Sequence, residues 1–179
     1  MTKFTTRDIA FIAMIAAIYT ALCLALAPIS FGMVQIRVAE ALTLLAIFSP
    51  IGIWGITLGC ALSNLVGFFT GANILGYMDI IFGTAATLIA AVLSWTFRNV
   101  RTFGVPLLSA VPPVVINALV IGAELAVLMN GEDSFAALFA VNAAYVAAGQ
   151  FLACFALGIP LALALERTGA AKVCFGTTL

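Results

Sequence analysis

The stretch from Gln35 to Leu42 reads QIRVAEAL, and it places an arginine and a glutamate within a long apolar region. Ionisable side chains are expensive inside a membrane, and a protein that keeps them there generally uses them. On a helix, the spacing of three residues brings Arg37 and Glu40 to one face, where their charged heads meet. Two interpretations follow. The pair is a structural element that neutralises itself, or it belongs with Gln35 to a polar binding pocket.

The composition around this stretch is that of an integral membrane protein. Of the 179 residues, 65% are hydrophobic and only 8% are charged, and the mean hydropathy is +1.26. A soluble domain of this length could not cover so much apolar surface with so few charges. The formal net charge is zero, so no basic field favours nucleic acid. Histidine is absent, which removes the commonest general base and metal ligand.

Six apolar segments predict one all-α domain over residues 1–179, an integral membrane bundle of six transmembrane helices. The apolar runs are continuous, unlike the alternating pattern of a membrane β-barrel. The second segment is short and charged. The sixth is longer than a bilayer requires, which predicts a tilt, a bend near Pro160 or an extension beyond the membrane. The predicted spans are 9–27, 34–48, 51–69, 78–97, 105–129 and 135–165.

Charge divides the connections between these spans into two groups. With six spans, both termini and the loops after the second and fourth spans share one side of the membrane. Six of the seven basic residues lie there: Lys3, Arg7, Arg98, Arg101, Arg167 and Lys172. The opposite loops contain Glu132 and Asp133 but no lysine or arginine. The positive-inside rule therefore predicts that the N- and C-termini are cytoplasmic.

This orientation gathers polar side chains in the outer half of the membrane and leaves the cytoplasmic half almost purely apolar. Such a one-sided distribution predicts a pocket open to the outside, although amides also join helices by hydrogen bonds. Asn142, Tyr145 and Gly149 are spaced by three and four residues along the sixth span. Gly149 has no side chain, so a ligand or a helix can come close to it. The predicted pocket residues are Gln35, Arg37, Glu40, Asn64, Asp79, Asn117, Glu124, Asn142 and Tyr145.

A second pattern lies on the first span, where alanines recur every four residues at positions 13, 17, 21 and 25. A row of small side chains lets another helix approach closely. The row serves either ordinary packing within the bundle or docking of a separate membrane protein.

Motifs for catalysis and for ATP binding are missing from the sequence. It contains no Gly-x-x-x-x-Gly-Lys phosphate loop, no nucleophile elbow and no Cys-x-x-Cys pair. We therefore expect no metal, no cofactor and no enzymatic activity in this chain, which leaves a binding or transport protein. Without internal repeats of the kind common in gradient-driven transporters, a partner ATPase is the favoured source of energy.

Three segments resemble the signature of the QueT family: Gln35–Leu42 with the later Pro50, Gly59 and Asn64, the run DIIFGTAATL from Asp79 to Leu88, and the pair Pro113 and Asn117. The resemblance covers nearly the whole chain. It implies the substrate-binding (S) component of an energy-coupling factor (ECF) transporter in a prokaryotic cell membrane. Such a component captures a queuosine precursor, a deazapurine such as preQ1, preQ0 or queuine, from outside. The implied partners are a transmembrane coupling protein (T component) and two ATPase subunits. Ala13, Ala17 and Ala21 match the small-residue motif that contacts the coupling protein.

The predicted pocket suits such a ligand chemically. A deazaguanine edge offers adjacent N–H donors to a carboxylate, and it offers a carbonyl to an amide. Most precursors also carry a cationic aminomethyl group, which a second carboxylate would stabilise by pairing with its charge. Among Glu40, Asp79 and Glu124, we expect Arg37 to orient one, with Glu40 as a candidate. Either Glu124 or Asp79 then reads the base edge. Asn64, Asn117 and Asn142 complete the hydrogen bonding and Tyr145 stacks on the base.

Two alternatives remain open from the sequence. The first is an S component for another vitamin or an amino acid, which would share the fold and differ only in the pocket. The second is a membrane scaffold whose polar residues only join helices.

Overall fold

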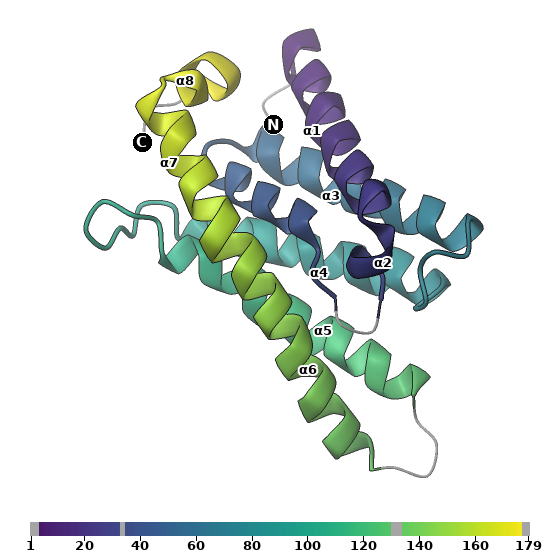
Figure 1. The fold of residues 1–179 in the computed structure, drawn as a ribbon. Helices are drawn as coiled ribbons and strands as arrows, with labels where there is room; N and C mark the ends of the chain where they lie inside the picture. The colour runs from purple at the N-terminus through teal and green to yellow at the C-terminus, as the bar shows by residue number, and fades with distance from the viewer. Residues whose placement is uncertain (1–3, 33–34, 130–133, 177–179) are drawn as a thin grey trace.

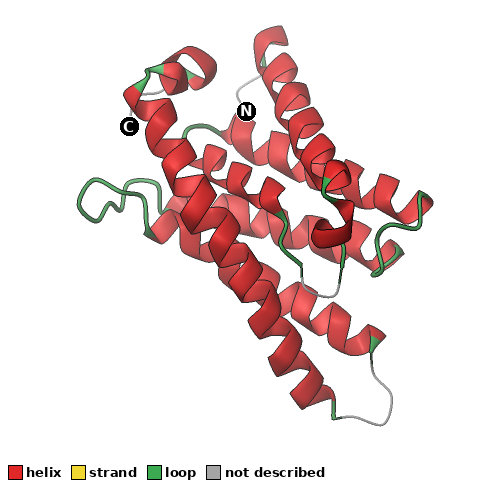
Figure 2. Cartoon of the chain, in the orientation of Figure 1, coloured by secondary structure: helices red, strands yellow, loops and turns green. Residues whose placement is uncertain are grey.

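Helices form almost all of the described chain, which comprises residues 4–32, 35–129 and 134–176 of this computed structural model (Figure 1). The described residues contain no strand, only a single β-bridge between Thr102 and Val105 (Figure 2). Five helical stretches are long and apolar enough to cross a membrane, which confirms the prediction of a helical membrane bundle. They are α1 (Thr6–Ala25), α3 (Pro50–Phe69), α4 (Tyr77–Thr96), η2 with α5 (Leu108–Ala110 and Val111–Leu128), and the continuous α6, η3 and α7 (Phe135–Phe151, Leu152–Gly158 and Ile159–Arg167).

Five of the six predicted spans match these stretches to within three residues at either end. The second predicted span, 34–48, differs, and residue 34 lies outside the described residues. Only η1 (Val38–Ile47) is helical here, in the tight 3₁₀ form, and it is too short to cross a bilayer alone. Residues 35–37 are not helical, and the N–H of Ile36 donates to the carbonyl of Ile29, at 2.9 Å, instead of to a helical neighbour.

The short helix η1 lies at the centre of the bundle, in contact with α1, α3, α4, η3 and α7. Eight of its ten residues are buried, and it is apolar on all sides except at Glu40 and Thr43. A helix that is apolar all round is stable only when other elements enclose it. The predicted second span is therefore the core around which the longer helices pack.

The first helix buries one face and exposes another. Its buried face presents Ile15 and Tyr19 to α3, where Gly55 and Gly59 allow very close contact. A Cβ atom built at Gly59 would lie 2.7 Å from the Cβ atom of Tyr19, so any larger residue there would separate the helices. The alanines at 13, 17, 21 and 25 are all exposed. Their row therefore does not serve packing within this bundle.

The last long helix is irregular at the place where a bend was one of the predicted outcomes. Immediately before Pro160 the chain adopts the wider π form, and the N–H of Ile159 donates to the carbonyl of Cys154. Proline has no N–H for the carbonyl four residues earlier, and π segments in helices commonly sit at such interruptions. The 33 residues from Phe135 to Arg167 extend over about 50 Å. This length exceeds the hydrocarbon thickness of about 30 Å.

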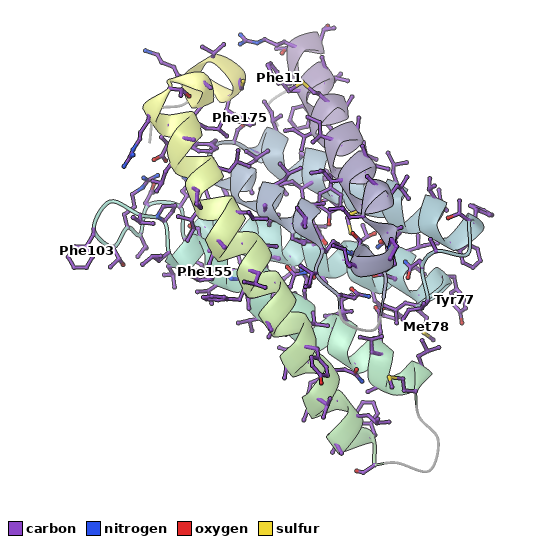
Figure 3. All side chains as sticks on the ribbon, in the orientation of Figure 1. Phe11, Tyr77, Met78, Phe103, Phe155 and Phe175 are labelled. Carbon is purple, nitrogen blue, oxygen red and sulfur yellow. The ribbon has the colours of Figure 1, made fainter. Side chains whose placement is uncertain are left out.

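Both ends of the described chain meet at the same end of the bundle. The guanidinium of Arg7 donates to the carbonyl of Val173 in α8 (Ala170–Phe175). The ring centroids of Phe11 and Phe175 lie 6.5 Å apart, and Figure 3 labels both residues at this end of the bundle. Lys3, Glu132 and Asp133, which entered the orientation argument, lie outside the described residues.

The loop from α4 to α5 joins this basic end as well. Glu166 accepts two hydrogen bonds from Arg101, at 3.0 and 2.5 Å, and this contact raises the pKa of the guanidinium. The loop is thus tied to the end of α7. Basic residues from four segments of the chain therefore gather around one end of the bundle.

Candidate ligand-binding site

A buried ion pair joins η1 to α4. Nη2 of Arg37 lies 2.9 Å from Oδ2 of Asp79, and the two side chains are only 3% and 0% exposed. The same carboxylate oxygen accepts a hydrogen bond from Asn73, at 2.8 Å. The ring of Phe31 lies 5.5 Å from the guanidinium carbon. Asp79 also stands in the first turn of α4, where the helix dipole favours a negative charge.

The candidate pairing of Arg37 with Glu40 is therefore corrected to a pairing with Asp79. The spacing argument assumed a regular helix through both residues. Arg37 instead stands just before η1 with a non-helical backbone, at a ψ of 86°, so its side chain leaves in another direction. It reaches a helix that begins forty residues later in the chain.

Glu40 is held by hydroxyl groups and not by a cation. Its Oε1 accepts from Tyr19 at 2.5 Å and from Thr87 at 3.4 Å, and its Oε2 accepts from Thr43 at 2.8 Å. The side chain is fully buried. Because the three donors come from α1, α4 and η1, Glu40 fastens these elements together. The hydrogen bonds seen here give Glu40 a structural role, and its role in ligand binding stays a prediction.

Six of the nine predicted pocket residues carry buried polar atoms for which the described residues offer no hydrogen-bond partner. The donors are Nε2 of Gln35, Nε of Arg37 and Nδ2 of Asn117, and the acceptors are Oδ1 of Asn64, Oδ1 of Asp79 and both carboxylate oxygens of Glu124. The other atoms of this kind in the described residues are five serine and threonine hydroxyls. Buried polar groups in native proteins are nearly always satisfied. This set of donors and acceptors therefore suits a polar ligand.

Several of these side chains belong to one network. Nδ2 of Asn64 donates to the backbone carbonyl of Asp79, at 2.7 Å, so it fixes the start of α4 against α3. The sulfur of Cys60 lies 3.7 Å from Nη1 of Arg37 and 3.2 Å from the hydroxyl of Thr87. The network links the Arg37–Asp79 pair to the threonine that donates to Glu40.

Four further residues of this network, Tyr19, Cys60, Asn73 and Thr87, are not among the predicted pocket residues. Tyr19, Cys60 and Thr87 lie in apolar runs of the sequence, and Asn73 follows the third predicted span. One signal points to Tyr19, because a buried tyrosine hydroxyl needs a partner.

The other predicted residues occupy different surroundings. Gly149 lies against the backbone of Gln35, and a Cβ atom built there would be 2.0 Å from that carbonyl oxygen. The predicted close approach is confirmed, and the group that approaches is the protein's own backbone. Asn142 is buried and donates to the sulfur of Met129 at 3.6 Å. Tyr145 is 50% exposed on α6, one helical turn after the buried Asn142.

A groove opens between α4 and α5 on one flank of the bundle. Its volume is about 420 Å³, and its lining residues are Met78, Phe82, Leu119, Val120, Ala123, Glu124 and Val127. Glu124 is the one ionisable group among them. Figure 3 shows Met78 beside Tyr77 at the start of α4, directly before Asp79 in the chain. Helix α4 therefore supplies residues both to the groove and to the buried network.

A helical membrane protein whose interior offers unpaired donors and acceptors has the features of proteins that bind and carry small polar molecules. The comparisons with known proteins agree with this class. The chain belongs to the QueT transporter family, whose model matches residues 9–167. It is 37% identical over 91 residues to a protein of Lactococcus lactis subsp. cremoris (strain MG1363) described as queuosine precursor transporter QueT. That match spans 50% of this chain and 50% of the relative. No solved structure matches.

Proposed function

We propose that this chain is the substrate-binding subunit of an ATP-driven ECF-type importer, and that it captures a queuosine precursor from outside the cell. Family membership and the description of the relative support the substrate class. The observation that carries the proposal is the set of unpartnered polar atoms on Gln35, Asn64, Asp79 and Asn117. These groups are buried in an apolar bundle, where a ligand that satisfies them gains more than it would in water.

The available atoms match the edge of a deazaguanine. Oδ2 of Asp79 is occupied by Arg37 and Asn73, whereas Oδ1, which has no partner among the described residues, can accept an N–H of the base. Because Arg37 and Asn73 fix the carboxylate in place, little entropy is lost when the ligand binds. The amides of Asn117 and Gln35 supply donors for the carbonyl oxygen of the base.

We propose six membrane crossings with both termini in the cytoplasm. Ends that meet on one side of a membrane require an even number of crossings, and five helices are long enough alone. The sixth crossing is η1 with residues 35–37 before it. After η1, Ser49 and Pro50 line a cavity with Phe4 and Asp8, so the chain has returned to the end where α1 begins.

The partners follow from what this chain exposes and what its sequence lacks. We propose that the exposed alanines of α1 contact a transmembrane coupling protein, because small side chains allow close helix packing. ATP hydrolysis then belongs to two partner ATPases, since the sequence contains no phosphate-binding loop.

Calorimetric titration of the purified protein with preQ1, preQ0, queuine and guanine tests the proposed function. We expect saturable binding of at least one deazapurine and weaker binding of guanine. Asn117→Ala should weaken that binding about tenfold, the effect of one lost hydrogen bond in a buried site. The matched control is Asn99→Ala, in the exposed loop at the opposite end, which should leave affinity unchanged. Absence of binding to every deazapurine would refute the proposal and favour an S component for another nutrient or a scaffold.

A further inference from the structure

The three buried carboxylates of the predicted pocket differ in what surrounds them. Asp79 has a cation, Arg37, and Glu40 has three hydroxyl donors. Glu124 is 7% exposed, and neither of its oxygens has a partner among the described residues. The ion pairs of the described chain are Arg37–Asp79 and Arg101–Glu166, and neither includes Glu124. Within the described residues, Glu124 is thus a buried acid without an ion-pair partner.

The apolar surroundings of Glu124 make a neighbouring cation more favourable for its carboxylate. The other groove-lining residues are all apolar, so little screening reduces the field of the carboxylate. An ionised carboxylate in such surroundings is stable only when a positive group pairs with it. The groove volume of about 420 Å³ falls within the range of small-molecule sites, about 300–1,000 Å³.

The position of the groove connects this need for a cation to the substrate. On helix α4, Met78 lines the groove and the next residue, Asp79, belongs to the buried network. Glu124 also shares a face of α5 with Asn117, seven residues earlier, whose amide donor has no partner among the described residues. A single ligand that contacts the network can therefore extend a side arm toward Glu124.

We propose that Glu124 binds a primary ammonium group on the substrate, and that this contact makes the protein select an aminomethyl deazapurine over neutral ones. This inference rests on the proposed function. A ligand with a neutral arm would leave the buried carboxylate without a partner, and sites of that kind reject such ligands strongly. In this arrangement Asp79 reads the base edge and Glu124 reads the charge of the arm.

The test compares preQ1, whose arm is an aminomethyl group, with preQ0, whose arm is an uncharged nitrile. Calorimetry on the detergent-purified protein should show preQ1 bound about ten- to a hundredfold more tightly than preQ0. Glu124→Gln should remove this preference by weakening preQ1, while preQ0, which no longer meets an unpaired carboxylate, binds at least as tightly as to the parent. Glu166→Gln is the matched control, because it removes a carboxylate at the opposite end, and it should retain the preference. Thermal unfolding without ligand verifies that each variant is folded.

Three results would overturn the inference. Equal affinity of the parent for the two ligands would remove the charge selection, and an equal loss of both ligands in Glu124→Gln would make Glu124 a general structural residue. A lipid amine is the other source of a primary ammonium. Native mass spectrometry from phosphatidylethanolamine nanodiscs, compared with phosphatidylcholine ones, would reveal lipid retention that depends on Glu124 without any preQ1 preference. If no deazapurine binds at all, the proposed function itself fails, which is a separate outcome.

Discussion

The side chains of Arg37 and Asp79 are both buried, so the charge of each is stabilised by the charge of the other. Neither side chain has access to water, and each would be a lone buried charge without its partner. Asn73 and Phe31 add a hydrogen bond and a ring contact to the pair. Because a lone buried charge costs far more than a matched pair, the two positions are energetically coupled.

A double-mutant cycle measures this coupling. Arg37→Met leaves the carboxylate of Asp79 unpaired and should reduce the free energy of unfolding by about 3–5 kcal/mol. Asp79→Asn leaves the guanidinium unpaired and should have a similar cost. The double variant should lose much less than the sum of the two, because neither position then leaves a lone buried charge. Reversible unfolding in mixed detergent micelles gives the three values, and simple additivity would show that the pair is not coupled.

The sequence predicted which residues gather in the interior better than it predicted how they pair. Of the nine polar residues assigned to the pocket, all except Tyr145 are buried. Their types and depths were visible because polar groups are conspicuous in an apolar chain. The partners were not visible, since Arg37 lies outside the helix, where its backbone is not helical, and Asn73 comes from a loop. Such contacts depend on the path of the chain in three dimensions.

At the scale of elements, hydropathy located the long helices and failed at η1. A helix that must cross a bilayer needs about 20 apolar residues, and this requirement fixes its ends closely. The 3₁₀ helix η1 is enclosed by protein on all sides, so bilayer thickness does not set its length. The irregular segment before Pro160 was anticipated because proline removes a helical hydrogen bond.

The contact between α6 and the chain before η1 predicts the effect of a single added methyl group. In Gly149→Ala, the new Cβ atom would collide with the backbone carbonyl of Gln35. We expect a loss of about 1–3 kcal/mol in the free energy of unfolding, and weaker ligand binding because Gln35 must move. Ala148→Val, which adds bulk on the exposed side of the same helix, should change neither quantity. Thermal unfolding and calorimetry measure the two effects, and a Gly149→Ala protein with unchanged stability would contradict the close contact between Gly149 and Gln35.

At the scale of the whole molecule, α1 has contacts of two kinds. Its buried face holds Tyr19, which bonds to Glu40 and packs against Gly59 of α3. Its exposed face carries the alanine row and faces away from the bundle. The surface that we assign to the coupling protein is therefore separate from the residues that we assign to the ligand. Binding and transport should accordingly respond to different substitutions.

Leucine substitutions on the exposed face of α1 test this separation. Ala17→Leu and Ala21→Leu each place a bulky side chain on the row without touching the interior. We expect unchanged stability and unchanged affinity for the deazapurine, but at least tenfold slower uptake by intact cells, because the partner helix can no longer approach. The control, Ala144→Leu, alters an exposed alanine of α6 to the same extent and should transport normally.

Uptake of labelled preQ1 and co-purification with the coupling protein are the two measurements. Normal uptake by both α1 variants would exclude the alanine row as the docking surface, whereas loss of binding would show that α1 shapes the ligand site itself.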